Sequence, residues 1–533
     1  MKAKHWIIFV LLVTFLIMLI PSYWVYNVDP YFHYHKPDIN KYYYELDNQR
    51  SQNDGIIRHF DYNAIITGSS MTVCFKTSEA DKLFNCSSIK IPFSGGSFKE
   101  INETLERAIN YTPDVKLIIR GLDMSYFLQD KDTMRSDLGE YPTYLYDSNP
   151  INDILYLLNK DVLFNHVYNM VISRQKDDFQ PGITSFDDYS QFHDDDVLGL
   201  KAVLPETQDV IVPPSETQHL TDDEKNTVIE NISQNVTALA YAHPEIEFYY
   251  FYPPYSIAYW LGLYSNGTIE KQLEIEALVT SMILECDNIH LYSFNTRDDV
   301  ISDLNNYIDT NHYIKAVNSL ILKWIHDGNG LITKENCDEY LAKEYDLLTN
   351  YNYASIFEQE DYESDLLAYA LLNNDLTGAE PIKLLNNIEC TTTTNNCEMQ
   401  KVSDETTSDN ESILICKGSS IINSNNDISL QLNSDNYVGA KININIDESH
   451  NYLAFEGQKV SDQGQPSVYV FNEDSVVVAK FVLDHASIDY DKHQYVLDLS
   501  GISGNVNILF NGGCVVQNGS PNSEYVFSNI TLY

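Results

Sequence analysis

Short apolar runs alternate with stretches of helical periodicity along the first two thirds of the chain. The apolar runs are Asn63–Thr67, Ser87–Pro92, Val115–Arg120, Ile246–Phe251 and Asn288–Phe294. Between them lie segments with the length and spacing of amphipathic helices, among them Met71–Phe84, and a polar helix is expected before the first run, over residues 40–59. This alternation predicts a parallel sheet covered by helices on both faces. Sheets of this kind gather their functional groups at the carboxyl ends of the strands.

A serine turn follows the first of these runs. Asn63–Thr67 leads directly into Gly68-Ser69-Ser70-Met71, and a helical pattern follows. A strand that turns sharply into a helix exposes a serine hydroxyl above the sheet, with backbone N–H groups beside it. Asp309-x-x-His312 comes after the last apolar run and before the last helical stretch. A serine nucleophile, a histidine base and an orienting carboxylate together indicate acyl chemistry.

Neither motif is unique in this sequence. A second Gly-Ser-Ser stands at Gly418-Ser419-Ser420, and Asp-x-x-His recurs at Asp287-x-x-His290 and Asp447-x-x-His450. His290 falls inside a predicted strand, and His450 belongs to a different part of the chain. Ser70 and His312 both follow strands of the same predicted sheet. We therefore assign Ser70, His312 and Asp309 as the candidate catalytic residues.

The amino-terminal segment indicates a membrane anchor. Residues Trp6–Ile20 are almost wholly apolar, and Lys2 and Lys4 precede them. A single-pass helix with a cytoplasmic N-terminus and an extracytoplasmic body is expected. A cleaved signal peptide is the competing interpretation. The aromatic flank at Tyr23 and Trp24 resembles an interfacial belt and lacks a small-x-small cleavage site, which favours the uncleaved anchor.

Composition narrows the function classes. The 533 residues include 77 acidic and 33 basic side chains, so the net charge of −44 argues against nucleic-acid binding. Eight cysteines occur without a Cys-x-x-Cys pair, and no metal or cofactor is predicted. His33 and His35 are interpreted as packing residues. Cys74 with Cys86 and Cys390 with Cys397 are near in sequence, although spacing alone does not establish a disulfide.

Four segments are expected along the chain. They are an anchor (1–26), an α/β domain (27–334), a helical connector and linker (335–384) and a β-sandwich module (385–533). Within the α/β domain, the proline-containing segment 174–220 is expected to be an insertion or lid. The last segment shows short alternating runs separated by turns, which is typical of an all-β sandwich or jelly roll. Such a module serves either to bind glycans or as a spacer.

The α/β part resembles the SGNH (GDSL-like) hydrolase superfamily over roughly residues 60–326. It looks most like the membrane-anchored extracytoplasmic branch that includes D-alanine-transfer proteins and alginate O-acetyltransferases. The blocks that carry the resemblance are Gly68-Ser69-Ser70-Met71, Pro92-Phe93-Ser94-Gly95-Gly96-Ser97, Arg120-Gly121-Leu122-Asp123 and Asp309-x-x-His312. The resemblance implies a flavodoxin-like, three-layer α/β/α domain. It also implies an oxyanion hole made by Ser70, Gly95, Gly96 and the position of Asp123.

Asp123 departs from the family pattern, which has Gly-x-Asn in that block. Asparagine donates a hydrogen bond to an oxyanion, whereas an ionised aspartate cannot. Asp123 is therefore protonated, or has another role, or leaves the oxyanion to backbone donors alone.

The resemblance implies a serine esterase or O-acyltransferase that acts on acyl esters, acetyl esters foremost, of a cell-surface polysaccharide. It also implies a membrane acyl-donor protein as a partner. The alternative is a catalytically inactive protein that binds glycans or assists polysaccharide assembly at the surface. The altered third block and the β module favour that alternative.

Overall fold

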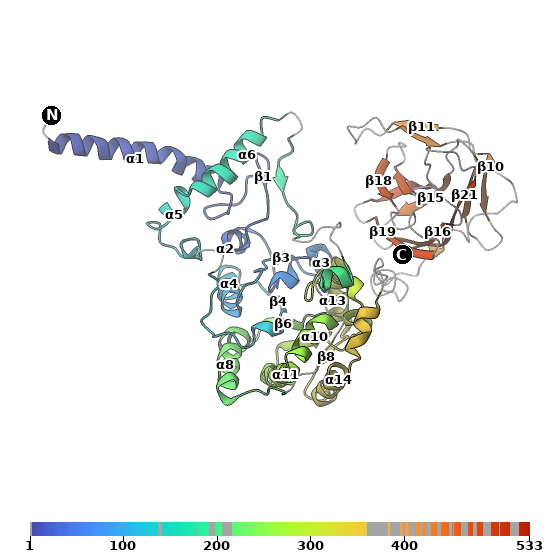
Figure 1. Cartoon of the computed structure of the whole chain (residues 1–533). Helices are drawn as coiled ribbons and strands as arrows, with labels where there is room; N and C mark the ends of the chain where they lie inside the picture. Colours follow the sequence, from blue (N-terminus) through green and yellow to red (C-terminus); the bar gives the residue numbers. More distant parts are fainter. Residues whose placement is uncertain are drawn as a thin grey trace. The chain divides into compact units, whose positions relative to one another are not determined.

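The computed structural model describes residues 3–136, 141–176, 179–190, 198–204 and 216–359, together with the strands between residues 382 and 533. The chain divides into two compact units, Met1–Tyr362 and Glu363–Tyr533 (Figure 1). Each unit has its own sheets and is described by itself.

A mainly parallel sheet forms the centre of the first unit. Its strands lie in the order β3-β2-β4-β6-β7-β8. Their bounds are β2 (Ala64–Thr67), β3 (Ser88–Lys90), β4 (Leu117–Gly121), β6 (Glu247–Tyr252), β7 (Ile289–Ser293) and β8 (Leu331–Ile332). The first five strands in this order run parallel, and β8 pairs antiparallel with β7. This confirms the predicted parallel sheet, and the order of its parallel strands is the flavodoxin-like one.

The strand order reverses at β2, which has β3 on one side and β4 on the other. A reversal of this kind opens a crevice beyond the carboxyl ends of the two central strands. Ser70 follows β2 and Asp123 follows β4. The topology therefore brings these two residues to the position where doubly wound sheets hold their ligands.

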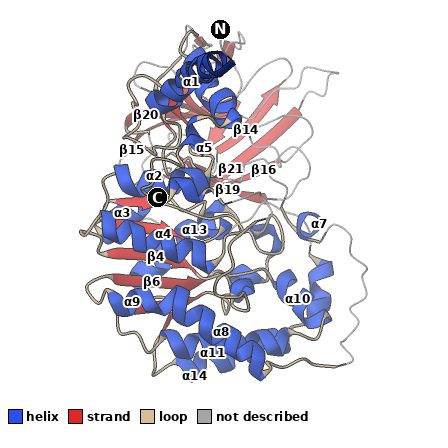
Figure 2. Ribbon diagram, turned by 90° about the vertical axis from the view of Figure 1, so that its left-hand side faces the viewer, coloured by secondary structure: helices blue, strands red, loops and turns tan. Residues whose placement is uncertain are grey.

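Two groups of helices surround the sheet (Figure 2). One group is α3 (Thr77–Phe84) packed on α13 (Lys315–Asp327). The other contains α4 (Phe98–Tyr111), α8 (Asp222–Ile232) and α11 (Ile269–Ile283), joined through the helical segment η5 (Ser233–Thr237). Such a pair of groups is expected when both faces of a parallel sheet are covered.

The helix expected over Met71–Phe84 is interrupted. A short 3₁₀ turn, η1 (Ser70–Thr72), comes first, and α3 begins only at Thr77. Between them the carbonyl oxygens of Val73 and Phe75 accept hydrogen bonds from the buried Lys90 Nζ at 2.5 and 2.7 Å. Those carbonyls are thus satisfied by an ammonium group, and the sequence pattern gave no indication of this.

The polar helix expected over residues 40–59 is shorter than predicted. Helix α2 spans Gln49–His59, and a two-residue strand, β1 (Tyr43–Tyr44), precedes it. β1 pairs in parallel with β5 (Gly182–Ile183), which lies in the segment expected to be an insertion. That pairing ties part of the 174–220 segment to the body of the unit.

The candidate disulfide between Cys74 and Cys86 is wrong, because neither residue takes part in a disulfide in the structure. Cys74 Sγ lies 3.2 Å from Ser190 Oγ, and Cys86 Sγ lies 3.7 Å from the carbonyl oxygen of Ala80. The pair Cys390 and Cys397 falls outside the described residues.

Helix α14 (Cys337–Thr349) packs on α11 through a buried polar cluster. Glu276 and Glu344 are both fully buried. Asn295 Nδ2 donates to Glu344 Oε1 at 2.9 Å and to Glu276 Oε1 at 3.3 Å. Burial raises the pKa of both carboxyl groups, that of Glu344 to about 6. At neutral pH this cluster therefore opposes folding.

Replacing Glu344 by glutamine should stabilise the first unit at pH 8. A carboxyl with a raised pKa binds its proton more tightly in the folded state, so stability falls as pH rises from about 4.5 through 6. The free energy of unfolding lost through Glu344 over this pH range is about 2 kcal/mol. Denaturant unfolding followed by the fluorescence of Trp260 and Trp324 measures it. The Glu344→Gln variant should have a higher free energy of unfolding than the parent at pH 8 and nearly the same one at pH 4. The variant Glu339→Gln, at an exposed position, should match the parent at both pH values. An equal loss of stability in Glu344→Gln at both pH values would contradict this account.

The second unit contains antiparallel sheets, which confirms its predicted all-β character. One sheet has the order β15-β20-β17-β18, and another contains β13-β14-β21-β16-β19. Side chains such as Phe455, Phe510 and Phe527 form a shared core. The strands are β13 (Ser419–Ile422), β14 (Ile428–Asn433), β15 (Gly439–Ile446), β16 (Tyr452–Lys459), β17 (Ser467–Phe471), β18 (Val477–Val482), β19 (Lys492–Asp498), β20 (Gly504–Asn511) and β21 (Asn522–Leu532). The jelly-roll assignment remains a prediction.

Helix α1 (Ala3–Val28) begins the first unit. Within Lys4–Val28 an 18-residue window has a mean hydropathy of 2.4, so this stretch is long and apolar enough to cross a membrane, a test that a signal sequence also passes. The last turn belongs to the folded body: Val25 and Val28 are buried, and the Tyr44 hydroxyl donates to the carbonyl oxygen of Val28 at 2.8 Å. The helix therefore enters the domain without a flexible linker.

Candidate active site

Ser70 stands at the first position of the turn that follows β2. Gly68 precedes it with a φ of +148°, and a Cβ at that position would lie 2.6 Å from Thr72 Cγ2. Glycine is needed there both for its backbone conformation and for space. Ser69 caps the turn, because its Oγ accepts from the backbone N–H of Met71 at 3.2 Å. The strand end and the cap thus fix the direction in which Ser70 leaves the sheet.

His312 lies on a closed loop between η6 (Leu304–Asn306) and α13. Ile308 N–H donates to the carbonyl oxygen of His312 at 2.9 Å, and Ile314 N–H donates to that of Asn306 at 2.9 Å. The loop is also tied to the segment after β6, because Ser256 Oγ donates to the carbonyl oxygen of Thr310 at 2.8 Å. These bonds define the position of the imidazole before any substrate is present.

The three predicted catalytic side chains form one hydrogen-bonded chain. Ser70 Oγ lies 2.7 Å from His312 Nε2, and His312 Nδ1 lies 2.6 Å from Asp309 Oδ2. Asp309 Oδ1 also accepts from the backbone N–H groups of Asn311 and His312, each at 2.8 Å. Residues 242 positions apart in the sequence are thereby brought into direct contact.

Asp309 is held in its ionised form. Burial by itself would raise the pKa of this carboxyl, but the His312 side chain and the two backbone N–H groups outweigh it, and the pKa lies below its usual value. An ionised Asp309 accepts a hydrogen bond from the Nδ1–H of His312, which leaves Nε2 as the acceptor for the Ser70 hydroxyl. This is the arrangement that a general base requires.

The two glycine residues expected to donate to the oxyanion differ in whether their N–H group is already used. Gly96 N–H donates to the carbonyl oxygen of Phe93 at 2.7 Å and is therefore already used in a turn. This corrects the expectation that Gly96 is a donor to the oxyanion. Gly95 has a φ of +59°, and Arg135 Nη1 occupies the space where its Cβ would lie. Gly95 is therefore the remaining candidate among the two glycine residues, in addition to the backbone N–H of Ser70.

Asp123 is buried and belongs to the same site. The Tyr255 hydroxyl donates to Asp123 Oδ1 at 2.5 Å, whereas Oδ2 is buried without a hydrogen-bond partner among the described residues. Burial raises the pKa of Asp123, and the nearby Ser69, Tyr255 and His312 lower it only in part. A neutral carboxyl group has an O–H to donate, which an ionised carboxylate lacks.

Tyr255 is a site residue that the sequence analysis missed. It follows β6, the next strand after β4 in the sheet order, and is fully buried. The rule that placed Ser70 and Asp123 at strand ends applies equally to the residues after β6. Tyr255 could have been found by extending that rule to the fourth run, Ile246–Phe251.

The rival histidines have other partners. His290 Nε2 lies 2.6 Å from Glu247 Oε2 on the neighbouring strand, which agrees with its interpretation as a hydrogen-bonded strand residue. His450 belongs to the second unit. His33 Nε2 contacts Asp153 Oδ1 at 3.3 Å, whereas His35 Nε2 contacts the carbonyl oxygen of Tyr26 at 2.8 Å. His33 and His35 thus point to different partners and do not converge on one point.

No protein-family model matches the sequence. A search of curated proteins likewise returns no match. Among solved structures, one similar chain is the tailspike protein 4 enzymatically active domain of bacteriophage CBA120, with 12% identity, a TM-score of 0.17 and coverage of 22% of this chain and 18% of that one. Another is the carbohydrate-binding module TmCBM61 in complex with β-1,4-galactotriose, with 7% identity, a TM-score of 0.17 and coverage of 22% and 80%. A third is the family 11 carbohydrate-binding module of a Clostridium thermocellum cellulase, with 12% identity, a TM-score of 0.15 and coverage of 25% and 93%. TM-scores this low do not establish a shared fold.

Proposed function

We propose that this chain is a membrane-anchored serine esterase or O-acyltransferase of the SGNH type, acting on acyl esters of a cell-surface polysaccharide. The observation that carries the proposal is the continuous chain from Ser70 Oγ through His312 to Asp309, with distances of 2.7 and 2.6 Å. An assembled chain of this kind favours an enzyme over a protein that only binds glycans. The polysaccharide and the acyl-donor partner come from the resemblance of the four sequence blocks.

The chemistry divides into two half-reactions. Ser70 Oγ attacks the acyl carbonyl carbon while its proton passes to His312 Nε2. The tetrahedral intermediate collapses, and the leaving alcohol takes that proton from His312, so that an acyl-Ser70 ester remains. Water or a sugar hydroxyl then gives its proton to His312 and attacks the ester, which releases Ser70. Asp309 stabilises the imidazolium in both halves.

The negative charge on the carbonyl oxygen requires donors that are already in place. The backbone N–H groups of Ser70 and Gly95 supply two. We assign a third to Asp123 in its neutral form. Its unpartnered Oδ2 and the surrounding burial support that role.

Adduct formation at Ser70 tests the proposal. Full-length protein in nanodiscs would be incubated with p-nitrophenyl acetate, with and without chito- or xylo-oligosaccharide acceptors, and digested for mass spectrometry. Acetate release without acceptor indicates an esterase, and acetylated oligosaccharide formed only with acceptor indicates a transferase. Absence of both turnover and an acetyl adduct on Ser70 would reject the enzyme.

Replacement of Asp123 should separate its neutral form from its ionised form. Asparagine donates at every pH, so Asp123→Asn should keep activity within a few fold at neutral pH and retain it at high pH. The parent should lose activity as pH rises through the raised pKa of Asp123, because the ionised form no longer donates. Asp123→Ala should lose about 10²–10³-fold in kcat. The pH profile of ester hydrolysis measures this, with the exposed Asp130→Asn as control. An asparagine variant as inactive as the alanine variant would exclude the donor role.

A further inference from the structure

An exposed apolar surface lies beside the end of α1. The segment α5 (Ile154–Leu157), η4 (Val162–Val167) and α6 (Tyr168–Ser173) buries Tyr156, Val162 and Val167 against the body of the unit. Its opposite side exposes large apolar residues. They are Ile151 (81% exposed), Ile154 (54%), Leu155 (56%), Phe164 (54%) and Tyr168 (50%). We call these five residues the juxtamembrane patch.

The patch is not a scatter of single side chains. Phe164, Tyr168 and Ile172 are exposed at successive intervals of four positions along the continuous helical stretch of η4 and α6, whereas Ile151 lies in the turn before α5. Residues four apart in a helical segment lie on one face. Contiguous apolar surface of this kind on a soluble domain marks a site of contact with a protein or a membrane.

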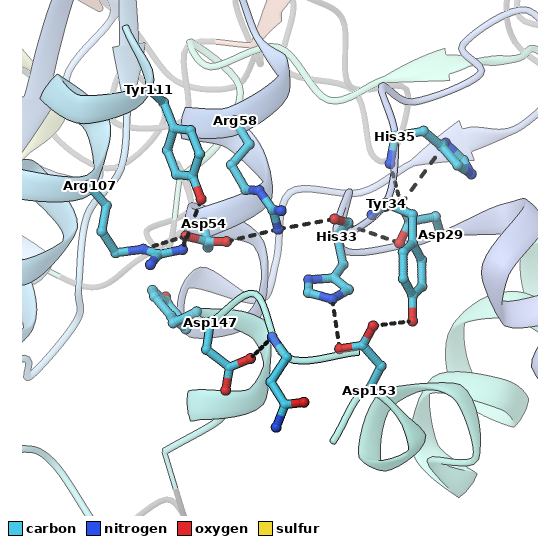
Figure 3. Close-up of polar contacts among 12 residues, drawn as sticks. Asp29, His33, Tyr34, His35, Asp54, Arg58, Arg107, Tyr111, Asp147 and Asp153 are labelled. Atoms are coloured by element: carbon cyan, nitrogen blue, oxygen red, sulfur yellow. Dashed lines mark hydrogen bonds and ion pairs between the residues drawn. The ribbon is translucent and has the colours of Figure 1, made fainter. Parts of the chain in front are cut away.

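A polar cluster fastens the segment to the point where α1 ends (Figure 3). Asp29 is buried and accepts from the backbone N–H groups of His33, Tyr34 and His35 and from the Tyr156 hydroxyl at 2.9 Å. Asp153 accepts from Tyr34 at 3.1 Å and contacts His33 at 3.3 Å. The segment and the end of α1 therefore form one rigid element.

Further contacts come from α1 and Tyr31. α1 itself packs against α5 and η4. Tyr31 stacks on Tyr156 with ring centroids 5.5 Å apart, and its hydroxyl lies 3.2 Å from His166 Nε2. Viewed end-on to α1, α5 lies close to it on the near side of the domain (Figure 2). The patch thus stands at a fixed position relative to the helix.

The length of α1 sets that position. The 25-residue stretch Lys4–Val28 is about 37 Å long, whereas the hydrocarbon core of a bilayer is about 30 Å thick. With Lys4 at one surface, the last turn, including Tyr26, therefore reaches the headgroup level on the other side. The segments α5 and η4, which carry part of the patch, pack against α1.

The described residues that carry the patch have a local excess of basic charge. The exposed charged residues from 151 to 176 are Lys160, Asp161, Arg174 and Lys176, and Asp177 and Asp178 follow in the sequence outside the described residues. The chain as a whole has 77 acidic and 33 basic residues. Basic side chains beside an apolar surface are attracted to anionic headgroups.

We propose that the juxtamembrane patch is a second membrane-contact site, which rests in the headgroup region of an anionic bilayer and holds the domain against the surface from which α1 emerges. The proposal rests on the insertion of α1 and not on the esterase chemistry. It commits to lipid because the patch continues the exposed apolar surface of α1. A protein partner on the same surface is one of the outcomes of the test.

Quenching by brominated lipid tests the contact in the full-length chain. Trp6 and Trp24 are changed to phenylalanine, so that only the buried Trp260 and Trp324 remain, and Phe164→Trp is added. The protein is reconstituted in nanodiscs that contain phosphatidylglycerol with bromine near the headgroup end of the acyl chains. The matched control is Tyr241→Trp in α9 (Ala238–Ala242), a residue with 60% exposure.

The tryptophan introduced by Phe164→Trp should lose emission in brominated lipid relative to unbrominated lipid, and the one introduced by Tyr241→Trp should not. Parallel quenching of the parent protein through Trp6 reports insertion of α1 separately.

Quenching of the parent without quenching of the Phe164→Trp variant would overturn the contact while the anchor stands. A blue-shifted but unquenched emission would indicate a protein neighbour and would also overturn it. Equal quenching of the control would show that the patch has no special role, and an unquenched parent would remove the premise. Ester hydrolysis is not part of the readout, so failure here and failure of the proposed enzyme are distinguishable.

Discussion

Replacing Ser70 by alanine should lower ester turnover by about 10⁴-fold or more and abolish the acetyl adduct. Alanine removes the attacking oxygen, which lies 2.7 Å from His312 Nε2. Turnover of p-nitrophenyl acetate and peptide mass spectrometry measure the two losses. Any activity that remains in the Ser70→Ala variant is expected to depend only on the remaining oxyanion donors.

The chain supplies a matched control for this experiment. Ser420, the last residue of the second Gly-Ser-Ser, lies in β13 of the other unit. Ser420→Ala makes the same chemical change in the same tripeptide and should leave turnover unchanged. If Ser70→Ala kept more than a tenth of the parent activity, Ser70 would not be the nucleophile.

Replacing Asp309 by asparagine should lower kcat by about 10⁴-fold with little change in structure. The amide keeps the size of the carboxylate but offers an N–H toward His312, which favours the tautomer with the proton on Nε2. That proton faces Ser70 Oγ, so His312 can no longer accept from the nucleophile. Circular dichroism should be unchanged, and KM should change much less than kcat.

The repeated motif again provides the control. Asp287 stands three residues before His290, as Asp309 stands before His312, but His290 contacts Glu247 instead. Asp287→Asn should therefore leave kcat unchanged. A comparable loss in both variants, or a loss of folded structure in Asp309→Asn, would contradict the tautomer argument.

Much of this site was predictable because strand ends obey a simple rule. Ser70, Asp123 and His312 follow apolar runs that form adjacent or nearby strands, and parallel strands bring such residues to one edge. The rule specifies which edge a residue reaches but not which N–H groups remain free there. Gly95 and Gly96 were equivalent in the sequence, and only the turn bond from Gly96 to Phe93 distinguishes them.

Two errors arose because sequence patterns carry no information about the direction of side chains in space. The helix expected over Met71–Phe84 is interrupted where Lys90 reaches the carbonyl oxygens of Val73 and Phe75. Helical periodicity describes only the chain's own side chains, so it contains no information about an ammonium group from the next strand. The Cys74–Cys86 pair failed similarly, because proximity in sequence does not fix the direction of the Cβ atoms.

The direct entry of α1 into the domain limits where this protein can work. Val25 and Val28 lie in the core, and Asp29 accepts hydrogen bonds from the backbone, so the described residues include no flexible tether between α1 and the domain. In the proposed membrane-anchored enzyme, Ser70 would therefore act at one fixed height above the bilayer. The spacing of modified sugars on a polymer would then be set by how the polymer strand passes that height and not by diffusion of the enzyme along the strand.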